Sequence, residues 1–270
     1  MAAGCATDGQ RDKDEADTSE EGTGLVDRIG SLKKALEQDP QNPELYYQLG
    51  NALYDMGVFG EAARMYQGAL KYNPNYADAY TNLGLTLRRL GQYKAAIGAY
   101  ESALDLNPDD AITLQNLMTA AELTGDTHRV IRCMRRLTEL QPDNAQAYAR
   151  LAQVLLATER YEEATAVYER LLLLDPGVVG DYYNLGLCHF NLSQWDLAER
   201  AWRQALKLDP RHASANKGLA VLYWSKGDYD AAWQAVTTCQ RLSIPLDPEF
   251  LHNLERDSGH AAAPRTDTHP

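Results

Sequence analysis

The stretch Pro43–Gly57 reads PELYYQLGNALYDMG, and it is followed by Glu61–Leu70, EAARMYQGAL, and then by the pair Asn73-Pro74. The same order of aromatic, glycine and alanine positions returns further along the chain. Proline recurs at one constant spacing, at Pro40, Pro74, Pro108, Pro142, Pro176 and Pro210. Self-similarity at this period indicates a solenoid of helical hairpins, in which each hairpin packs on its neighbours.

Six full units follow from this period, and each one predicts two helices. The units are 43–76, 77–110, 111–144, 145–178, 179–212 and 213–246. The turn between the two helices often contains glycine, which accepts the left-handed conformation common at helix ends. These glycines are Gly57, Gly91, Gly125 and Gly227. The second helix usually ends at Asn-Pro or Asp-Pro, because proline cannot continue a helix and disfavours helical geometry in the residue before it.

Small and large side chains occupy fixed positions in these units. The small residues are Gly50, Gly84 and Gly186 in the first helices, and Ala62, Ala96, Ala164, Ala198 and Ala232 in the second helices. The large ones are Tyr46, Tyr80, Tyr148, Tyr182, Tyr66, Tyr100, Tyr168 and Trp202. Facing helices interdigitate by alternating large and small residues, so we interpret these tyrosines as packing residues.

This pattern resembles the tetratricopeptide repeat (TPR) family, whose short units carry an aromatic residue, Leu-Gly, and then alanine, an aromatic residue, alanine and proline. The resemblance covers about residues 24–256, nearly nine tenths of the chain. It implies an all-α fold, a right-handed α-solenoid of stacked TPR hairpins. The unit 111–144 departs most from the pattern, at Leu114, Met118, Val130 and Met134.

The two ends differ from the repeats. Residues 1–22 are polar and acidic and predict a disordered tail, because they cannot bury enough apolar surface to order themselves. We expect the solenoid over 23–256, beginning with a half-repeat at 23–42. Asp247 and Pro248 form an N-cap signal for a capping helix over 247–256, and 257–270 reads as a second disordered tail.

Charge and cysteine content narrow the function classes. The formal net charge of −12 argues against nucleic-acid binding, which needs clustered Lys and Arg. The four cysteines form no CxxC pair, so the sequence predicts neither a disulfide framework nor a zinc site. Arg129, Arg132, Arg135 and Arg136 form a local basic group, read either as a solvated face or as a docking site for an acidic segment.

One alternative concerns the start of the chain. Ala2-Ala3-Gly4-Cys5 resembles the end of a bacterial lipoprotein signal, in which small residues precede an acylated cysteine. This interpretation requires an upstream signal with charged and apolar regions. It would make the protein a membrane-tethered lipoprotein, on the periplasmic face, that assists assembly of an envelope or pilus complex. The first expectation is a cytoplasmic protein, with membrane attachment only if Cys5 is lipidated.

The sequence carries no recognisable catalytic set. The six histidines lie in separate units or in the tail, and there is no P-loop, GxGxxG or GxSxG motif. His189 falls at a packing register, and we interpret it as a satisfied core histidine. The TPR resemblance also implies binding rather than catalysis. We therefore expect no enzyme activity, no cofactor, no metal and no small-molecule substrate.

The resemblance implies that the first helices line a concave groove that binds a peptide segment of another protein. By register, the first two units contribute Glu44, Tyr47, Gln48, Asn51, Tyr54, Asp55, Asp78, Thr81, Asn82, Leu85, Arg88 and Arg89. Later units contribute Asn116, Arg150, Leu156, Tyr183, Asn184, Leu187, Phe190, Val221 and Trp224. The lysine and arginine positions of the dicarboxylate clamp found in chaperone-binding relatives are not basic here.

Two features of this predicted groove suggest how it binds, and each has a structural alternative. Asn82, Asn116 and Asn184 share one register with Gln48, and a row of amides suits an extended peptide backbone. The alternative is local capping and solubility. Tyr183, Leu187, Phe190 and Trp224 collect in the later units and resemble a binding hot spot. The alternative is contact between successive helices. The oligomeric state is left open.

Overall fold

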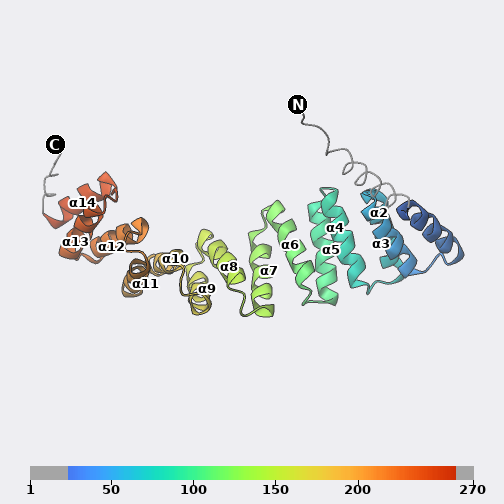
Figure 1. Ribbon diagram of the computed structural model, residues 1–270, viewed down its shortest axis with the longest axis horizontal. Coiled ribbons are helices and arrows are strands. Elements are labelled where there is room, and N and C mark those ends of the chain that lie inside the picture. The colour runs from blue at the N-terminus through green and yellow to red at the C-terminus, as the bar shows by residue number, and fades with distance from the viewer. Residues whose placement is uncertain (1–23, 260–270) are drawn as a thin grey trace, which may run out of the picture. The chain divides into compact units, whose positions relative to one another are not determined.

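The computed structural model describes residues 24–259, and within that range every regular element is an α-helix. The described residues divide into two compact units, 24–140 and 141–259. In each unit, successive helices form hairpins that pack side by side in chain order (Figure 1). This arrangement confirms the predicted all-α fold of stacked hairpins. The predicted tail 1–22, including Cys5, lies outside the described residues, as do residues 260–270. The last helix reaches Ser258, beyond the predicted capping helix 247–256, so the first residues of the predicted tail 257–270 are helical.

The first unit begins with a helix over residues 24–38. It continues with α2 (Pro43–Asp55), α3 (Phe59–Tyr72), α4 (Ala77–Arg89), α5 (Tyr93–Leu106), α6 (Ala111–Thr124) and α7 (Thr127–Leu140).

The second unit contains α8 (Ala145–Ala157), α9 (Tyr161–Leu174), α10 (Val179–Asn191), α11 (Trp195–Leu208), α12 (Ala213–Lys226), α13 (Tyr229–Arg241) and α14 (Pro248–Ser258). Asp247 caps α14 as predicted, since its side chain accepts a hydrogen bond from the Glu249 backbone N–H and Pro248 opens the helix.

The predicted stop signals account for the helix ends. Four second helices end at a residue that precedes proline and has an extended backbone, with φ near −135° at Asn73, Asn107, Asp175 and Asp209. The helix α13 instead ends before a left-handed Ser243, with φ 58°. First helices end in a left-handed residue, such as Gly57 with φ 78°. The sequence did not predict that Glu159 and Ser193 would take this role in two hairpins, with φ 57° and 58°. Non-glycine residues adopt this conformation at some energetic cost.

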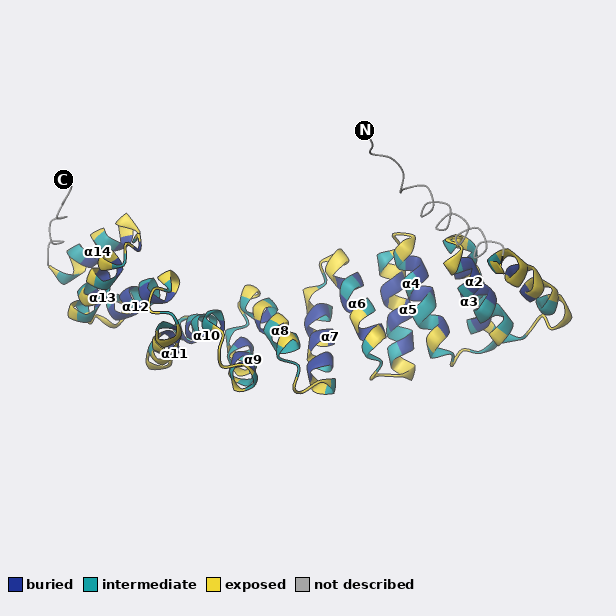
Figure 2. Ribbon diagram, viewed as in Figure 1, coloured by how far each residue is buried: buried dark blue, intermediate teal, exposed yellow. Residues whose placement is uncertain are grey.

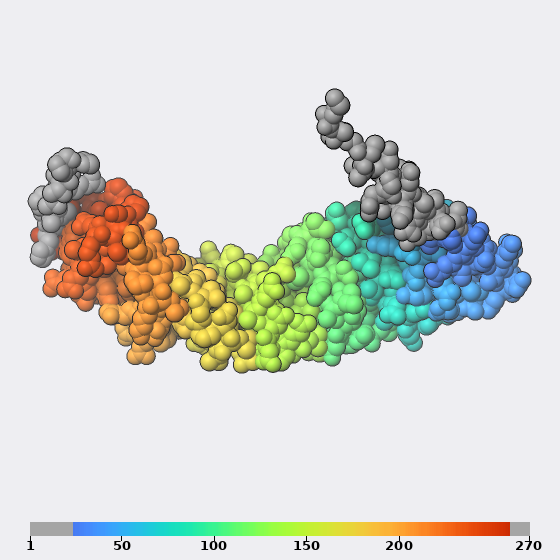
Figure 3. Space-filling model, viewed as in Figure 1, coloured from blue at the N-terminus to red at the C-terminus, as the bar shows by residue number. Residues whose placement is uncertain are grey.

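The core lies between paired helices, where buried residues face one another (Figure 2). Side chains fill the spaces between successive helices (Figure 3). The ring of Tyr100 is fully buried and lies against Gly84 of the paired helix. A Cβ at Gly84 would lie 2.5 Å from Tyr100 Cε1, a distance that atoms in proteins do not tolerate. Gly50 with Tyr66, and Gly186 with Trp202, repeat this contact.

The unit 111–144 keeps the same core positions despite its different residues. Leu114, Met118, Val130 and Met134 are all buried. Aliphatic and thioether side chains thus fill the places that aromatic and small residues fill elsewhere, and methionine suits such irregular gaps.

Cys133, Cys188 and Cys239 are free and buried. Burial raises the pKa of the Cys133 and Cys188 thiols from 9.0 to about 11, because the thiolate is poorly solvated inside the protein. Burial also raises the pKa of Cys239.

Replacing Gly84 with alanine should destabilise the first unit by about 1–3 kcal/mol, because the new methyl group collides with the Tyr100 ring. The matched control is Gly98→Ala in α5, where a Cβ meets no atom within 4 Å. That change should be neutral or stabilise the helix by up to about 1 kcal/mol. Denaturant unfolding of both variants tests the pair, and equal effects would contradict the close-approach argument.

In a Cys5→Ser protein, the three described thiols should react with Ellman's reagent at least about a hundredfold more slowly in the native state than in denaturant. The physical reason is the raised pKa, which leaves less thiolate at a given pH, together with burial. The native rate should keep rising as pH passes 9, whereas the denatured rate levels off there. Rapid native labelling would contradict the burial of these side chains.

Candidate functional site

A hollow of about 400 Å³ lies in the first unit, and we call it the first-unit hollow. It is lined by Arg28, Asn51, Tyr54, Asp55, Tyr66, Asn82 and Leu85. Five of these residues, Asn51, Tyr54, Asp55, Asn82 and Leu85, belong to the predicted groove, and they come from α2 and α4. The helix of residues 24–38 contributes Arg28, and α3 contributes Tyr66. The register prediction thus brings residues of two repeats to one place.

A network of hydrogen bonds fixes the two asparagines of this hollow. The Asn82 amide nitrogen donates to Asn51 Oδ1 at 2.9 Å and to the Tyr47 hydroxyl at 3.2 Å. The Tyr66 hydroxyl donates to the same Asn51 oxygen at 2.7 Å. Among the described residues, neither the Asn51 amide nitrogen nor Asn82 Oδ1 has a hydrogen-bond partner. The hollow therefore keeps one amide donor and one amide acceptor available.

Tyrosines surround this network. Tyr47 packs against Tyr76 with ring centroids 4.8 Å apart. The Tyr76 hydroxyl donates to Glu44 at 2.6 Å, and Gln48 donates to the same carboxylate at 2.8 Å. These bonds lower the pKa of Glu44, with the Tyr76 contribution the larger. Burial raises the pKa of Tyr66, so its hydroxyl remains a hydrogen-bond donor at neutral pH.

The remaining predicted residues of the first unit lie outside the hollow. Arg88 on α4 is half-buried, and its Nε is buried without a hydrogen-bond partner among the described residues. Burial raises the pKa of Tyr100, and the nearby Arg88 guanidinium partly offsets that rise. Asn116 on α6 is half-buried, and its side chain makes no hydrogen bond to the described residues. The predicted row of asparagines is therefore not uniform, because Asn82 is held by its neighbours and Asn116 is not.

The predicted aromatic residues of the second unit take part in packing. The rings of Tyr183 and Phe190 lie 6.3 Å and 5.7 Å from the ring of buried Trp202. Trp224 packs edge-on against Phe250 and donates its indole N–H to Asp257 at 3.0 Å. The other members are Asn184 and Leu187, both half-buried, and Arg150, which is exposed. Packing thus accounts for a large part of this aromatic group.

The basic group on α7 is neutralised by acids within the first unit. Arg129 pairs with Glu101 at 2.9 Å and with Asp126, and Arg132 pairs with Glu101 at 2.8 Å. Arg136 pairs with Asp109 and with Glu139. These ion pairs connect α7 to α5 and the loop that follows it, so most of the cationic charge is balanced locally.

His189 is buried, and its Nδ1 lies 2.7 Å from the Gln194 side-chain oxygen. This contact confirms the prediction of a satisfied core histidine. Among residues 24–259, no cluster of three or more His, Cys, Asp or Glu side chains is placed to hold a metal ion. None of the helices in that range is both long and apolar enough to span a bilayer.

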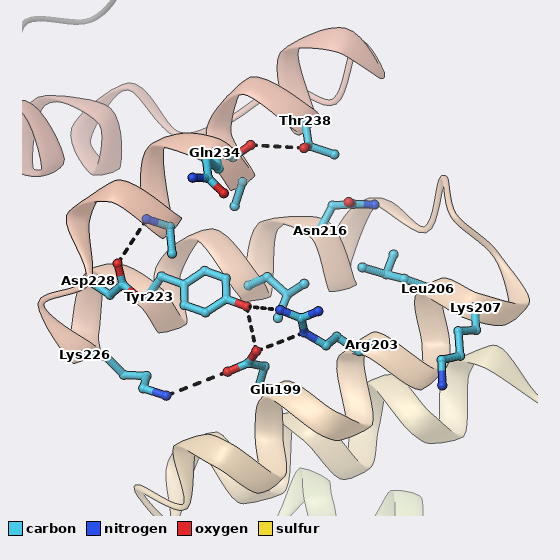
Figure 4. A pocket seen from close by; sticks show the side chains of 13 residues that line it. Glu199, Arg203, Leu206, Lys207, Asn216, Tyr223, Lys226, Asp228, Gln234 and Thr238 are labelled. Carbon is cyan, nitrogen blue, oxygen red and sulfur yellow. Dashed lines mark hydrogen bonds and ion pairs between the residues drawn. The ribbon is translucent and has the colours of Figure 1, made fainter.

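A second hollow, of about 670 Å³, lies in the second unit, and we call it the second-unit hollow (Figure 4). It is lined by Glu199, Arg203, Leu206, Lys207, Asn216, Leu219, Tyr223, Lys226, Asp228, Ala231, Gln234, Ala235 and Thr238, from α11 to α13. None of these residues was predicted to form a site. The sequence feature that could have indicated this hollow is Asn216, because four other units carry tyrosine at the same position.

One comparison with known structures supports the fold. The Naa15/Naa10 complex bound to HypK-THB matches with a TM-score of 0.72 at 15% identity, over 90% of this chain and 37% of that one. YrrB, described as a TPR protein with an unusual peptide-binding site, matches with a TM-score of 0.48 at 22% identity, over 68% and 95% of the two chains. MamA from Desulfovibrio magneticus RS-1 gives 0.46 at 24%, over 62% and 94%.

Sequence models of one repeat family match most of the chain. Tetratricopeptide repeat models match residues 47–111 and 183–237, residues 123–185, and residues 29–57. No curated protein sequence matches the chain significantly. Repeats of this kind generally act as non-catalytic modules, which supports a role in protein–protein interaction. Their period, their helical hairpins and these matches lead to one conclusion: the chain belongs to the tetratricopeptide repeat family.

Proposed function

We propose that this protein is a non-catalytic adaptor and that the first-unit hollow holds a peptide segment, extended or helical, of a partner protein. One observation carries the proposal. Asn51 and Asn82 are held in place by Tyr66 and Tyr47, yet one amide nitrogen and one amide oxygen have no partner among the described residues. A peptide backbone presents the complementary acceptor and donor.

The hollow offers more than these two groups. Tyr54 and Leu85 provide apolar surface for a side chain of the peptide, and Asp55 and Arg28 bring one charge of each sign to its lining. A rigid site loses less conformational entropy when it binds, and the hydrogen bonds among the asparagines and tyrosines provide such rigidity. The second-unit aromatics support the proposal less, because Tyr183, Phe190 and Trp224 already contact their own core.

Replacing Leu85 with tryptophan should fill the first-unit hollow without removing any bond of the asparagine network. In affinity capture from native lysate, followed by mass spectrometry, the amount of captured partner should then fall at least about tenfold relative to wild type. The matched control is Lys94→Trp, which adds the same side chain at an exposed position of α5 outside the hollow.

The control should capture the same proteins as wild type, and both variants should retain helical circular dichroism. A partner captured equally by all three proteins would contradict the proposed site. This test is cleaner than removing Phe190 or Trp224, whose loss would also weaken the core of the second unit.

Replacing Asn82 with alanine should lower the free energy of unfolding by about 1–3 kcal/mol, because Asn51 and Tyr47 each lose a hydrogen-bond partner. Asn116→Ala is the matched control at the same register. It should change stability by less than about 0.5 kcal/mol, because its side chain makes no hydrogen bond to the described residues. Equal losses in urea unfolding would show that the amide network contributes nothing specific.

A further inference from the structure

The second-unit hollow lies where the repeat normally places a tyrosine ring. One register of the first helices, counted once per repeat, reads Tyr46, Tyr80, Leu114, Tyr148, Tyr182 and Asn216. In the first repeat, the Tyr46 ring packs on the second helix of its own hairpin. A Cβ built on Gly68 would lie 2.5 Å from this ring, and Tyr72 stacks on it at 5.6 Å. Thr238 has the register of Gly68 and lines the hollow.

Asn216 keeps the polar contact of this tyrosine but not its ring. The Tyr46 hydroxyl donates to the Pro40 carbonyl at 3.4 Å. The Asn216 amide nitrogen donates to the Pro210 carbonyl at 3.2 Å, and Pro210 has the same register as Pro40. The first helix of the first repeat and that of the sixth repeat are therefore bonded in the same way to the loop before them. The sixth repeat lacks only the tyrosine ring. The missing ring leaves open the part of the hollow that Asn216 and Thr238 line, and Ala231 and Ala235 also line the hollow.

Four side chains of the hollow, Glu199, Arg203, Tyr223 and Lys226, form one network of hydrogen bonds and ion pairs. Glu199 accepts from Tyr223 at 2.8 Å and from Arg203 at 2.9 Å, and Arg203 also donates to the Tyr223 hydroxyl at 3.0 Å (Figure 4). Lys226 pairs with Asp196 at 2.8 Å and lies 3.7 Å from Glu199. Because these ions are already paired with one another, an uncharged ligand can bind in the hollow without leaving a buried ion unpaired.

The groups that stay available favour an aromatic occupant with a polar tip. Leu206, Leu219, Ala231 and Ala235 supply apolar wall. Asn216 is only 6% exposed, and its side-chain oxygen has no hydrogen-bond partner among the described residues. Such an oxygen is an acceptor for a phenolic hydroxyl, and a buried tyrosine normally requires one such partner.

We propose that the second-unit hollow binds a tyrosine side chain of a partner polypeptide, which takes the place of the ring that Asn216 omits. The occupant is a polypeptide residue because the equivalent space in the other repeats is filled by a residue of a polypeptide. The lining also includes Lys207 and Gln234, both exposed and without side-chain partners among the described residues. Their donors can bind backbone carbonyls that flank the inserted ring. This site is independent of the first-unit hollow.

The test compares two peptides and three forms of the full chain. The peptides are Ac-Ala-Ala-Tyr-Ala-Ala-NH2 and its Leu analogue, titrated into protein with isotope-labelled alanine and leucine methyl groups. In wild type, the Tyr peptide should shift the methyl signals of Leu206, Leu219 and Ala235 and bind at least about tenfold more tightly than the Leu peptide.

Asn216→Tyr restores the residue of the other repeats, so it should raise Tm and abolish these shifts. Ala235→Met narrows the hollow from α13 and should also abolish the peptide-induced shifts. Methionine is the residue that the first repeat carries at this register, as Met65. As a further control, Leu85→Trp should leave the shifts unchanged, which separates this site from the one in the first unit.

Equal binding by wild type and both blocking variants would overturn the proposal, as would equal affinity for the Tyr and Leu peptides. An absence of shifts in the hollow of wild type would also overturn it. A lower Tm for Asn216→Tyr would contradict the inference that the hollow has the shape of the missing ring, and in that case Ala235→Met still decides the binding.

Discussion

The contact between a large ring on a second helix and a glycine on its paired first helix, made in three hairpins, determines the rest of the structure. Tyr100 on Gly84 is the clearest case, and Tyr66 on Gly50 and Trp202 on Gly186 are equivalent. The close approach of backbones leaves no room for a Cβ, so the two helices of a hairpin have one possible register. That register decides which residues of the first helix remain for recognition, because the residues facing the partner helix are already buried.

The distribution of charge limits what the protein recognises. The chain carries a net charge of −12, yet its densest cluster of arginines, on α7, is paired with Glu101, Asp109 and other acids of the same unit. In the second-unit hollow, Glu199 is likewise paired with Arg203 and Lys226. In both hollows the remaining groups include amides and apolar side chains, with Arg28 and Asp55 in the first and Lys207 in the second. Shape and hydrogen bonding, rather than net charge, then provide the selectivity of both proposed sites.

Much of the fold follows from the sequence because repetition makes each local signal visible several times. The proline stops, the glycine turns and the opposed small and large residues all predict the observed helices. By contrast, Glu159 and Ser193 take left-handed turn positions that no residue preference predicts. Register placed Asn51 and Asn82 on one face, but it did not predict that these two side chains would bond to each other. Hydrogen-bond partners depend on side-chain rotamers and on distances across repeats, which the sequence pattern does not contain.

The second-unit hollow escaped prediction for a related reason: a site formed by a missing side chain leaves no motif of its own. This hollow also has a consequence for the history of the protein. Tyrosine and asparagine codons differ only in their first base, so one nucleotide change at position 216 separates the filled repeat from the open one. Because Asn216 retains the bond to the Pro210 carbonyl, the open form keeps its helix start. A lineage can thus open or close such a hollow in one step while retaining the same repeat.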